Sequence, residues 1–170
     1  MSRYRKQVKP RRVGHFCYSV ALLAKPNSMR NGVHAEIAES AAHMRTINRI
    51  TGRILNAALH IHSDLGPGLF ESVYEMILAY ELEQEGLAVE RQKVIGIRYK
   101  SLEIKNAFKA DLLIEGCVLV EIKSVPELAL VHYKQVLSYL RLMDLRMGIL
   151  INFGQGKLKD GFKRIANSAR

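Results

Sequence analysis

The sequence contains few cysteines and no long apolar run. Its two cysteines, Cys17 and Cys117, lie far apart in unlike contexts and show neither a disulfide framework nor zinc-ligand spacing. No apolar run approaches the roughly 20 residues that span a bilayer, and no internal repeat or low-complexity segment is visible. These absences exclude a disulfide-stapled scaffold, a zinc-binding module and a membrane-spanning protein. We therefore expect a cytoplasmic chain of ordinary globular composition that has no membrane partner.

The net charge of +10 is concentrated near the N-terminus. Residues 1–45 hold nine Lys or Arg and two Asp or Glu, whereas residues 46–170 hold seventeen and fourteen. We interpret residues 1–43 as a basic, disordered extension and Met44 as the natural initiator, because periodic sequence begins directly after it. A nucleic-acid-binding arm and a targeting segment are alternative interpretations of the extension. Residues 44–170 then form a single folded domain.

The apolar periodicity beyond residue 45 predicts helices and strands in a definite order. The helices are expected over residues 46–65, 69–85 and 127–143. The strands are expected over residues 88–100, 102–104, 108–115, 117–123 and 147–153. The second helix is expected to bury a stripe of Val73, Ile77 and Tyr80, and residues 158–167 fit either a short helix or an edge strand. This order predicts an α/β domain with a central mixed β-sheet flanked by α-helices.

Two apolar runs that carry acidic residues form the most informative part of the chain. Asp111 lies in the first run, and Glu121 and Lys123 lie in the second. The turn at Gly116 predicts an antiparallel hairpin in which opposed residue numbers sum to about 232, so Asp111 faces Glu121. Side chains alternate along a strand, so Glu121 and Lys123 point to the same face. Two carboxylates and an ammonium group are therefore expected to converge on one patch.

Both runs are apolar on both faces, which favours a covered, central hairpin over a solvated cross-strand salt bridge. Charges at such a place are costly unless they are paired or bind a metal ion. Carboxylate oxygens are the ligands that Mg²⁺ prefers, and Mn²⁺ accepts the same donors. An ammonium group beside them can orient a water molecule or neutralise developing negative charge. The sequence therefore predicts a divalent-metal site at Asp111 and Glu121, with Lys123 assisting.

Three further polar residues are candidates for the same site. Glu71 lies early in the second helix, where the helix dipole alone would favour an acid. Gln135 and Tyr139 are four residues apart and share a face of the third helix, where they either form a partly exposed polar flank or line the cleft with the carboxylates. His132 lies on the same stripe, and we interpret it as a positioning or surface histidine rather than a ligand.

These residues together resemble the PD-(D/E)XK nuclease superfamily and, more narrowly, the family named for its GxxExxY motif. That motif is here Gly68 to Tyr74 (GLFESVY), and the likeness covers residues 46–167. It also includes residues 110–113 (ADLL), 120–125 (VEIKSV), 148–153 (GILINF) and 158–161 (LKDG). Ala110 stands where the name of the superfamily has proline, a substitution that we expect the fold to tolerate. The resemblance implies a restriction-endonuclease-like core over residues 44–170.

The resemblance also implies divalent-metal-dependent hydrolysis of nucleic-acid phosphodiester bonds, with DNA favoured over RNA. The implied metal ligands are Asp111, Glu121, Glu71 and the carbonyl of Ile122. The implied catalytic residues are Asp111, Glu121, Lys123, Glu71, Gln135 and Tyr139. The chain has no evident second domain, which leaves specificity to a homodimer or a partner protein. The alternatives are a nucleic-acid- or partner-binding module with little catalysis, and an enzyme acting on a small phosphorylated substrate.

Overall fold

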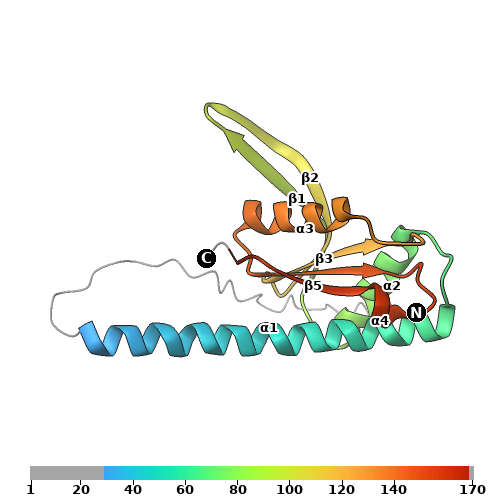
Figure 1. The fold of residues 1–170 in the computed structure, drawn as a ribbon, viewed down its shortest axis with the longest axis horizontal. Coiled ribbons are helices and arrows are strands. Elements are labelled where there is room, and N and C mark those ends of the chain that lie inside the picture. The colour runs from blue at the N-terminus through green and yellow to red at the C-terminus, as the bar shows by residue number, and fades with distance from the viewer. Residues whose placement is uncertain (1–28, 169–170) are drawn as a thin grey trace, which may run out of the picture.

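A computed structural model describes residues 29–168 and shows a mixed five-stranded sheet with helices on both faces (Figure 1). The helices are α1 (Met29–Leu65), α2 (Glu71–Gln84), α3 (Leu130–Met143) and α4 (Leu158–Gly161). The strands are β1 (Val89–Tyr99), β2 (Leu102–Ile114), β3 (Val118–Lys123), β4 (Met147–Asn152) and β5 (Phe162–Ala166). Their order in the sheet follows the chain, with β3 and β4 parallel and the other neighbours antiparallel. The α/β fold is thus confirmed.

Two apolar cores cover the two faces of the sheet. Helices α1 and α2 pack on one face, where Ile54 and Leu78 meet the side chains of β3 and β4. Helix α3 packs on the other face through Val136 and Leu140. A Cβ at Gly148 would lie 2.6 Å from the Val136 side chain, so the glycine lets α3 approach β4 closely. The central strands β3 and β4 are therefore covered on both sides, as their continuous apolar sequences predict.

Helix α1 is longer than the sequence pattern indicates. It begins at Met29 rather than near residue 46, so residues 29–43, which the sequence assigns to the extension, are helical. This stretch is rich in alanine and glutamate, which favour helix without needing an apolar stripe. Met44 lies inside α1, and residues 1–28 lie outside the described part of the chain.

The predicted apolar stripe of α2 is wrong at Tyr80, while Val73 and Ile77 are half-buried beside the buried stripe. The helix buries Tyr74, Leu78 and Leu82, whereas Tyr80 is 57 % exposed. Two stripes with three- or four-residue spacing lie side by side in this sequence, so helical periodicity alone could not choose between them. The packing of Tyr74 against the sheet decides the choice.

The remaining boundaries differ in smaller ways. The predicted strands over residues 102–104 and 108–115 are one continuous strand, β2, whose pairing with β1 shifts at an irregularity between Ile95 and Ile97. The third helix begins at Leu130 rather than residue 127. The tail forms both of its alternatives, α4 followed by the edge strand β5. No helix in the described part of the chain is long and apolar enough to cross a bilayer.

Candidate metal-binding and catalytic site

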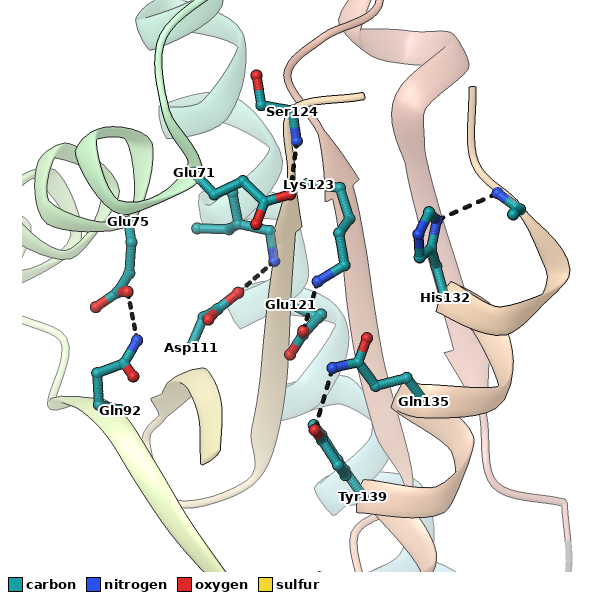
Figure 2. A network of polar contacts seen from close by, with 12 residues as sticks. Glu71, Glu75, Gln92, Asp111, Glu121, Lys123, Ser124, His132, Gln135 and Tyr139 are labelled. Carbon is teal, nitrogen blue, oxygen red and sulfur yellow. Dashed lines mark hydrogen bonds and ion pairs between the residues drawn. The ribbon is translucent and has the colours of Figure 1, made fainter. Parts of the chain in front are cut away.

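The β2–β3 hairpin brings the predicted charged trio together. Its paired residues, from Leu112 opposite Val120 onward, have numbers that sum to 232, as predicted. At the next position along β2, the Asp111 carboxylate accepts a hydrogen bond of 2.8 Å from the backbone N–H of Ile122. The ammonium group of Lys123 donates a 2.7 Å hydrogen bond to Oε1 of Glu121 (Figure 2). The alternating pleat thus presents two carboxylates and one ammonium group on a single patch.

Glu121 carries the most unusual environment in this patch. The residue is only 2 % exposed, and its second carboxylate oxygen, Oε2, is buried without a hydrogen-bond partner. Burial raises the pKa of Glu121 to about 7, and the negative charge of Asp111 adds to the rise. The hydrogen bond and positive charge of Lys123 lower the pKa, but they do not offset the loss of water. A carboxyl oxygen without a hydrogen-bond partner at this position is therefore available for a cation.

The same network alters the pKa values of the two neighbours of Glu121. Burial raises the pKa of Asp111, although the Ile122 hydrogen bond and the Lys123 charge oppose it. Burial alone would lower the pKa of Lys123, but the hydrogen bond to Glu121 and the surrounding carboxylates raise it above its usual value. Lys123 is thus held as a cation, whereas both carboxylates resist ionisation without further positive charge.

This donor set fits a divalent ion with oxygen ligands. Asp111 and Glu121 supply carboxylate oxygens, and Glu121 Oε2 has no other partner. No group of three or more His, Cys, Asp or Glu within residues 29–168 is arranged to hold a metal ion, so the structure gathers two acids rather than three. Such a site leaves coordination positions for water and substrate, as in sites where Mg²⁺ keeps part of its hydration shell.

Glu71 reaches the end of β3 from the start of α2. Its Oε1 accepts a 3.1 Å hydrogen bond from the backbone N–H of Ser124, and the Ser124 hydroxyl donates to the carbonyl of Leu69 at 2.7 Å. Its negative charge also acts on Asp111 and Lys123. Figure 2 shows Glu71 above the Asp111 and Glu121 carboxylates. Glu71 therefore borders the carboxylate pair, while its direct contact is with the backbone after Lys123.

The glycine and tyrosine of the GLFESVY segment fix where α2 begins. Gly68 has a φ of 115°, a conformation that side-chain-bearing residues rarely adopt. The Tyr74 hydroxyl donates to the carbonyl of Gly66 at 2.6 Å and accepts from the N–H of Leu69 at 3.3 Å. Its ring stacks on Phe153, with centroids 4.2 Å apart and planes 5° from parallel. These contacts tie the loop before Glu71 to the residue that follows β4.

Gln135 and Tyr139 lie on α3 and are joined by a 3.1 Å hydrogen bond from the amide of Gln135 to the tyrosine hydroxyl. Their polar ends point toward Glu121 and Lys123 in Figure 2. Gln135 is half-buried and Tyr139 is buried, so the pair does not form an exposed flank. His132 instead accepts a 3.2 Å hydrogen bond from the N–H of Ala129 and caps the start of α3.

Sequence reasoning missed Glu75 and its two partners at the foot of the β1–β2 hairpin. Glu75 is 4 % exposed and accepts hydrogen bonds of 2.9 Å from Arg91 and 2.5 Å from Gln92. Its charge also raises the pKa of Asp111. Glu75 follows Glu71 by four residues, so helical spacing already placed both acids on one face of α2. That spacing was the available signal for Glu75, whereas the sequence around Arg91 and Gln92 gave no indication that they would pair with it.

Asn152 is the other residue that the sequence did not single out. It is fully buried, and its side-chain oxygen accepts from the N–H groups of Val125 and Gly154 at 3.0 and 3.1 Å. Its amide donates to the Val125 carbonyl at 2.8 Å. The backbone N–H of Phe153 donates to the Lys123 carbonyl at 2.8 Å. These bonds satisfy the buried backbone beyond β3 and hold Lys123 in place.

Comparison with known proteins agrees with this geometry. Residues 48–165, more than half of the chain, match the PD-(D/E)XK nuclease superfamily. No curated protein and no solved structure matches the sequence. The matched region contains Asp111, Glu121 and Lys123. The chain belongs to the PD-(D/E)XK nuclease superfamily.

Proposed function

We propose that the protein is a divalent-metal-dependent nuclease of the GxxExxY type that hydrolyses phosphodiester bonds, with DNA as its preferred substrate. The observation that carries the proposal is the buried Oε2 of Glu121, which has no hydrogen-bond partner and lies in a site with Asp111 and Lys123. A retired site would have no physical reason to keep two repelling carboxylates, one buried and one half-buried. Membership of a superfamily whose enzymes act on nucleic acid with divalent metals supports the same conclusion.

Asp111 and Glu121 would hold Mg²⁺ or Mn²⁺ through their carboxylate oxygens, and the Ile122 carbonyl would be a further oxygen ligand. Glu71 would complete the shell through a water molecule. When bound, such an ion would polarise the phosphate and lower the pKa of a bound water molecule. Specificity beyond the phosphodiester would come from a second copy of the chain or from a partner protein.

Lys123 would perform two tasks from one position. Its ammonium group is held on Glu121 at 2.7 Å and keeps its proton, because the surrounding carboxylates raise its pKa. It can therefore donate a hydrogen bond to the attacking water and then offset the negative charge that grows on the phosphate oxygens. Gln135 and Tyr139 would orient the substrate backbone, since their polar ends point toward Glu121 and Lys123.

The test is hydrolysis of end-labelled single-stranded DNA, duplex DNA, branched DNA and RNA with Mg²⁺ or Mn²⁺, against EDTA. Glu121→Ala and Lys123→Ala should abolish metal-dependent cleavage while retaining the circular dichroism spectrum of the fold. The matched controls are Glu83→Ala and Lys159→Ala, exposed residues on α2 and α4 that should leave the rate unchanged. Cleavage that survives in both site variants would overturn the proposal. Salt-dependent nucleic-acid binding without cleavage would favour a binding module instead.

A further inference from the structure

The β1–β2 hairpin extends well beyond the rest of the molecule. In Figure 1 its base joins the sheet beside α3, while its distal half projects away from the domain. The far end pairs Ile97 with Ile104, Arg98 with Glu103 and Tyr99 with Leu102. A two-stranded ribbon gains little stability by itself, so an arm of this length calls for a partner.

A bend separates the base of this hairpin from its tip. Ile95 pairs with Phe108 and Ile97 pairs with Ile104, so Gly96 on β1 lies opposite residues 105–107 on β2. A Cβ at Gly96 would lie 3.3 Å from the carbonyl oxygens of Ile104 and Lys105, a contact that only glycine avoids. Extra residues on one strand bend a ribbon and increase its twist. The irregularity in strand pairing therefore sets the direction in which the tip projects.

An apolar strip runs along one face of the hairpin from its contact with α3 to the tip. Side chains alternate along β1, so Ile95, Ile97 and Tyr99 share a face. At the base, Ile95 is buried against α3. At the tip, Tyr99 is 65 % exposed. Cross-strand partners share a face as well, so Leu102, which is 56 % exposed, lies beside Tyr99.

The base of the strip touches the candidate active site. The Phe108 ring lies 5.5 Å from the ring of Tyr139, measured between centroids, and the Tyr139 hydroxyl accepts a hydrogen bond from Gln135. A groove of about 420 Å³ opens between the two hairpin strands and Leu142 of α3. The strip is thus continuous with the site rather than an isolated patch.

The tip is also positively charged. Residues 96–106 contain Arg98, Lys100 and Lys105 against Glu103, which is three positive charges and one negative, a net charge of +2. The Lys100 ammonium group lies 5.4 Å from the centroid of the Tyr99 ring. Arg98 and Glu103 approach only to 4.0 Å with both side chains largely exposed, so their pairing neutralises little.

We infer that the hairpin tip binds an unpaired stretch of the nucleic-acid substrate, with a base stacked on Tyr99 and Leu102 and phosphates near Lys100 and Lys105. Exposed aromatic rings next to cations are the features that hold single strands, whereas duplex bases already stack on one another. A second copy of the tip would bring the same positive charge and would be repelled. The inference rests on the proposed function in that the ligand is nucleic acid.

The geometry limits where this stretch lies relative to the cleavage site. Leu102 precedes Asp111 by nine positions along β2, so the tip lies at most roughly 30 Å from the metal-binding carboxylates. That span corresponds to about nine base-pair steps of duplex DNA. The arm would therefore favour a substrate in which unpaired nucleotides lie within one helical turn of the scissile bond, such as a flap or a branch.

The test measures binding without cleavage, with the full chain in EDTA. Fluorescence anisotropy would give the Kd for a labelled 20-nucleotide single strand, its duplex, and the duplex with a single-stranded flap. Tyr99→Ala should weaken single-strand and flap binding by about 5- to 150-fold, the range for loss of one stacked base. Tyr99→Phe should restore binding because it keeps the ring. Lys100→Ala should lower the salt dependence by about one phosphate contact.

Tyr80→Ala is the matched control, because Tyr80 is similarly exposed but lies on α2. Its affinity should equal that of the unmodified protein. Unchanged affinity of Tyr99→Ala for all three probes would overturn the inference, as would the absence of any binding by the unmodified chain. A dimer that Tyr99→Ala converts to a monomer with no loss of DNA affinity would assign the tip to a second copy instead. If Tyr99→Ala weakens binding but the unmodified chain cleaves no substrate, the result would support nucleic-acid binding by the hairpin tip and refute the proposed nuclease function.

Discussion

Replacing Glu121 with glutamine should stabilise the metal-free protein at alkaline pH. Glu121 is 2 % exposed and its pKa is raised from 4.5 to about 7. A tenfold change in an acid dissociation constant corresponds to about 1.4 kcal/mol, so keeping this carboxylate ionised costs the fold about 3 kcal/mol. Glutamine can still accept the hydrogen bond from Lys123 but carries no charge. The melting temperature of Glu121→Gln at pH 8 should rise by about 6–12 °C.

The sign of the pH dependence follows from the direction in which burial moves this pKa. Below pH 4.5 Glu121 is protonated in the folded and unfolded chains, and no penalty arises. Between pH 4.5 and 7 the unfolded chain releases the proton that the folded chain keeps, so the free energy of unfolding falls as pH rises. The raised pKa of Asp111 acts in the same direction. The raised pKa of Lys123 gives stability that is constant over this window and is lost only at higher pH, above 10.5.

Urea denaturation in EDTA from pH 4.5 to 9 measures this effect. The slope between pH 4.5 and 7 should flatten in Glu121→Gln and remain in the control Glu83→Gln, which alters an exposed acid of α2. Equal stability of Glu121→Gln and the unmodified chain at pH 8 would refute the reasoning. It would mean that another interaction offsets the cost of keeping this buried carboxylate ionised.

Three further changes test the same network. Mg²⁺ or Mn²⁺ at about 100 times its Kd should stabilise the unmodified protein at pH 8 by about 2.7 kcal/mol in thermal melts. The same ion should leave the stability of Glu121→Gln unchanged. Equal stabilisation of both proteins would mean that the ion binds elsewhere. Tyr74→Phe keeps the ring stack but leaves the half-buried Gly66 carbonyl without the tyrosine hydroxyl, so urea denaturation should show a loss of about 1–2 kcal/mol. No loss would argue against the hydroxyl as a loop anchor. Gly154→Ala should cost about 1–3 kcal/mol because its Cβ would overlap the backbone of Val125, whereas Gly156→Ala, with open space around it, should cost little.

The centre of the site was predictable because it depends on local rules. The turn at Gly116 sets the register of the hairpin, and strand alternation then places Asp111, Glu121 and Lys123 together. The apolar strands around them indicated burial, which the structure confirms for β3 and β4. The general α/β architecture followed from the order of the periodic segments.

The parts that escaped prediction depend on packing between distant segments. The buried stripe of α2 was chosen by Tyr74 stacking on Phe153, a contact between residues 79 positions apart, taking 153 minus 74. Glu75 is held by hydrogen bonds from Arg91 and Gln92, which lie on a different element. Gln92 has a φ of 50°, a conformation that a glutamine in the sequence does not predict. The roles of Glu71, Gln135 and Tyr139 in catalysis stay predictions, although the structure brings all three to the border of the carboxylate pair.

The short β2–β3 connection has a consequence for how the chain reaches its fold. Asp111 and Glu121 are separated by a tight turn, so closing the chain between them costs little entropy, and hairpins of this kind form within about 1–10 μs. The two carboxylates therefore repel each other as soon as the middle of the sheet forms during folding. We expect an available cation, or a proton at lower pH, to accelerate folding itself, so that the ion acts on the nascent domain before any substrate does.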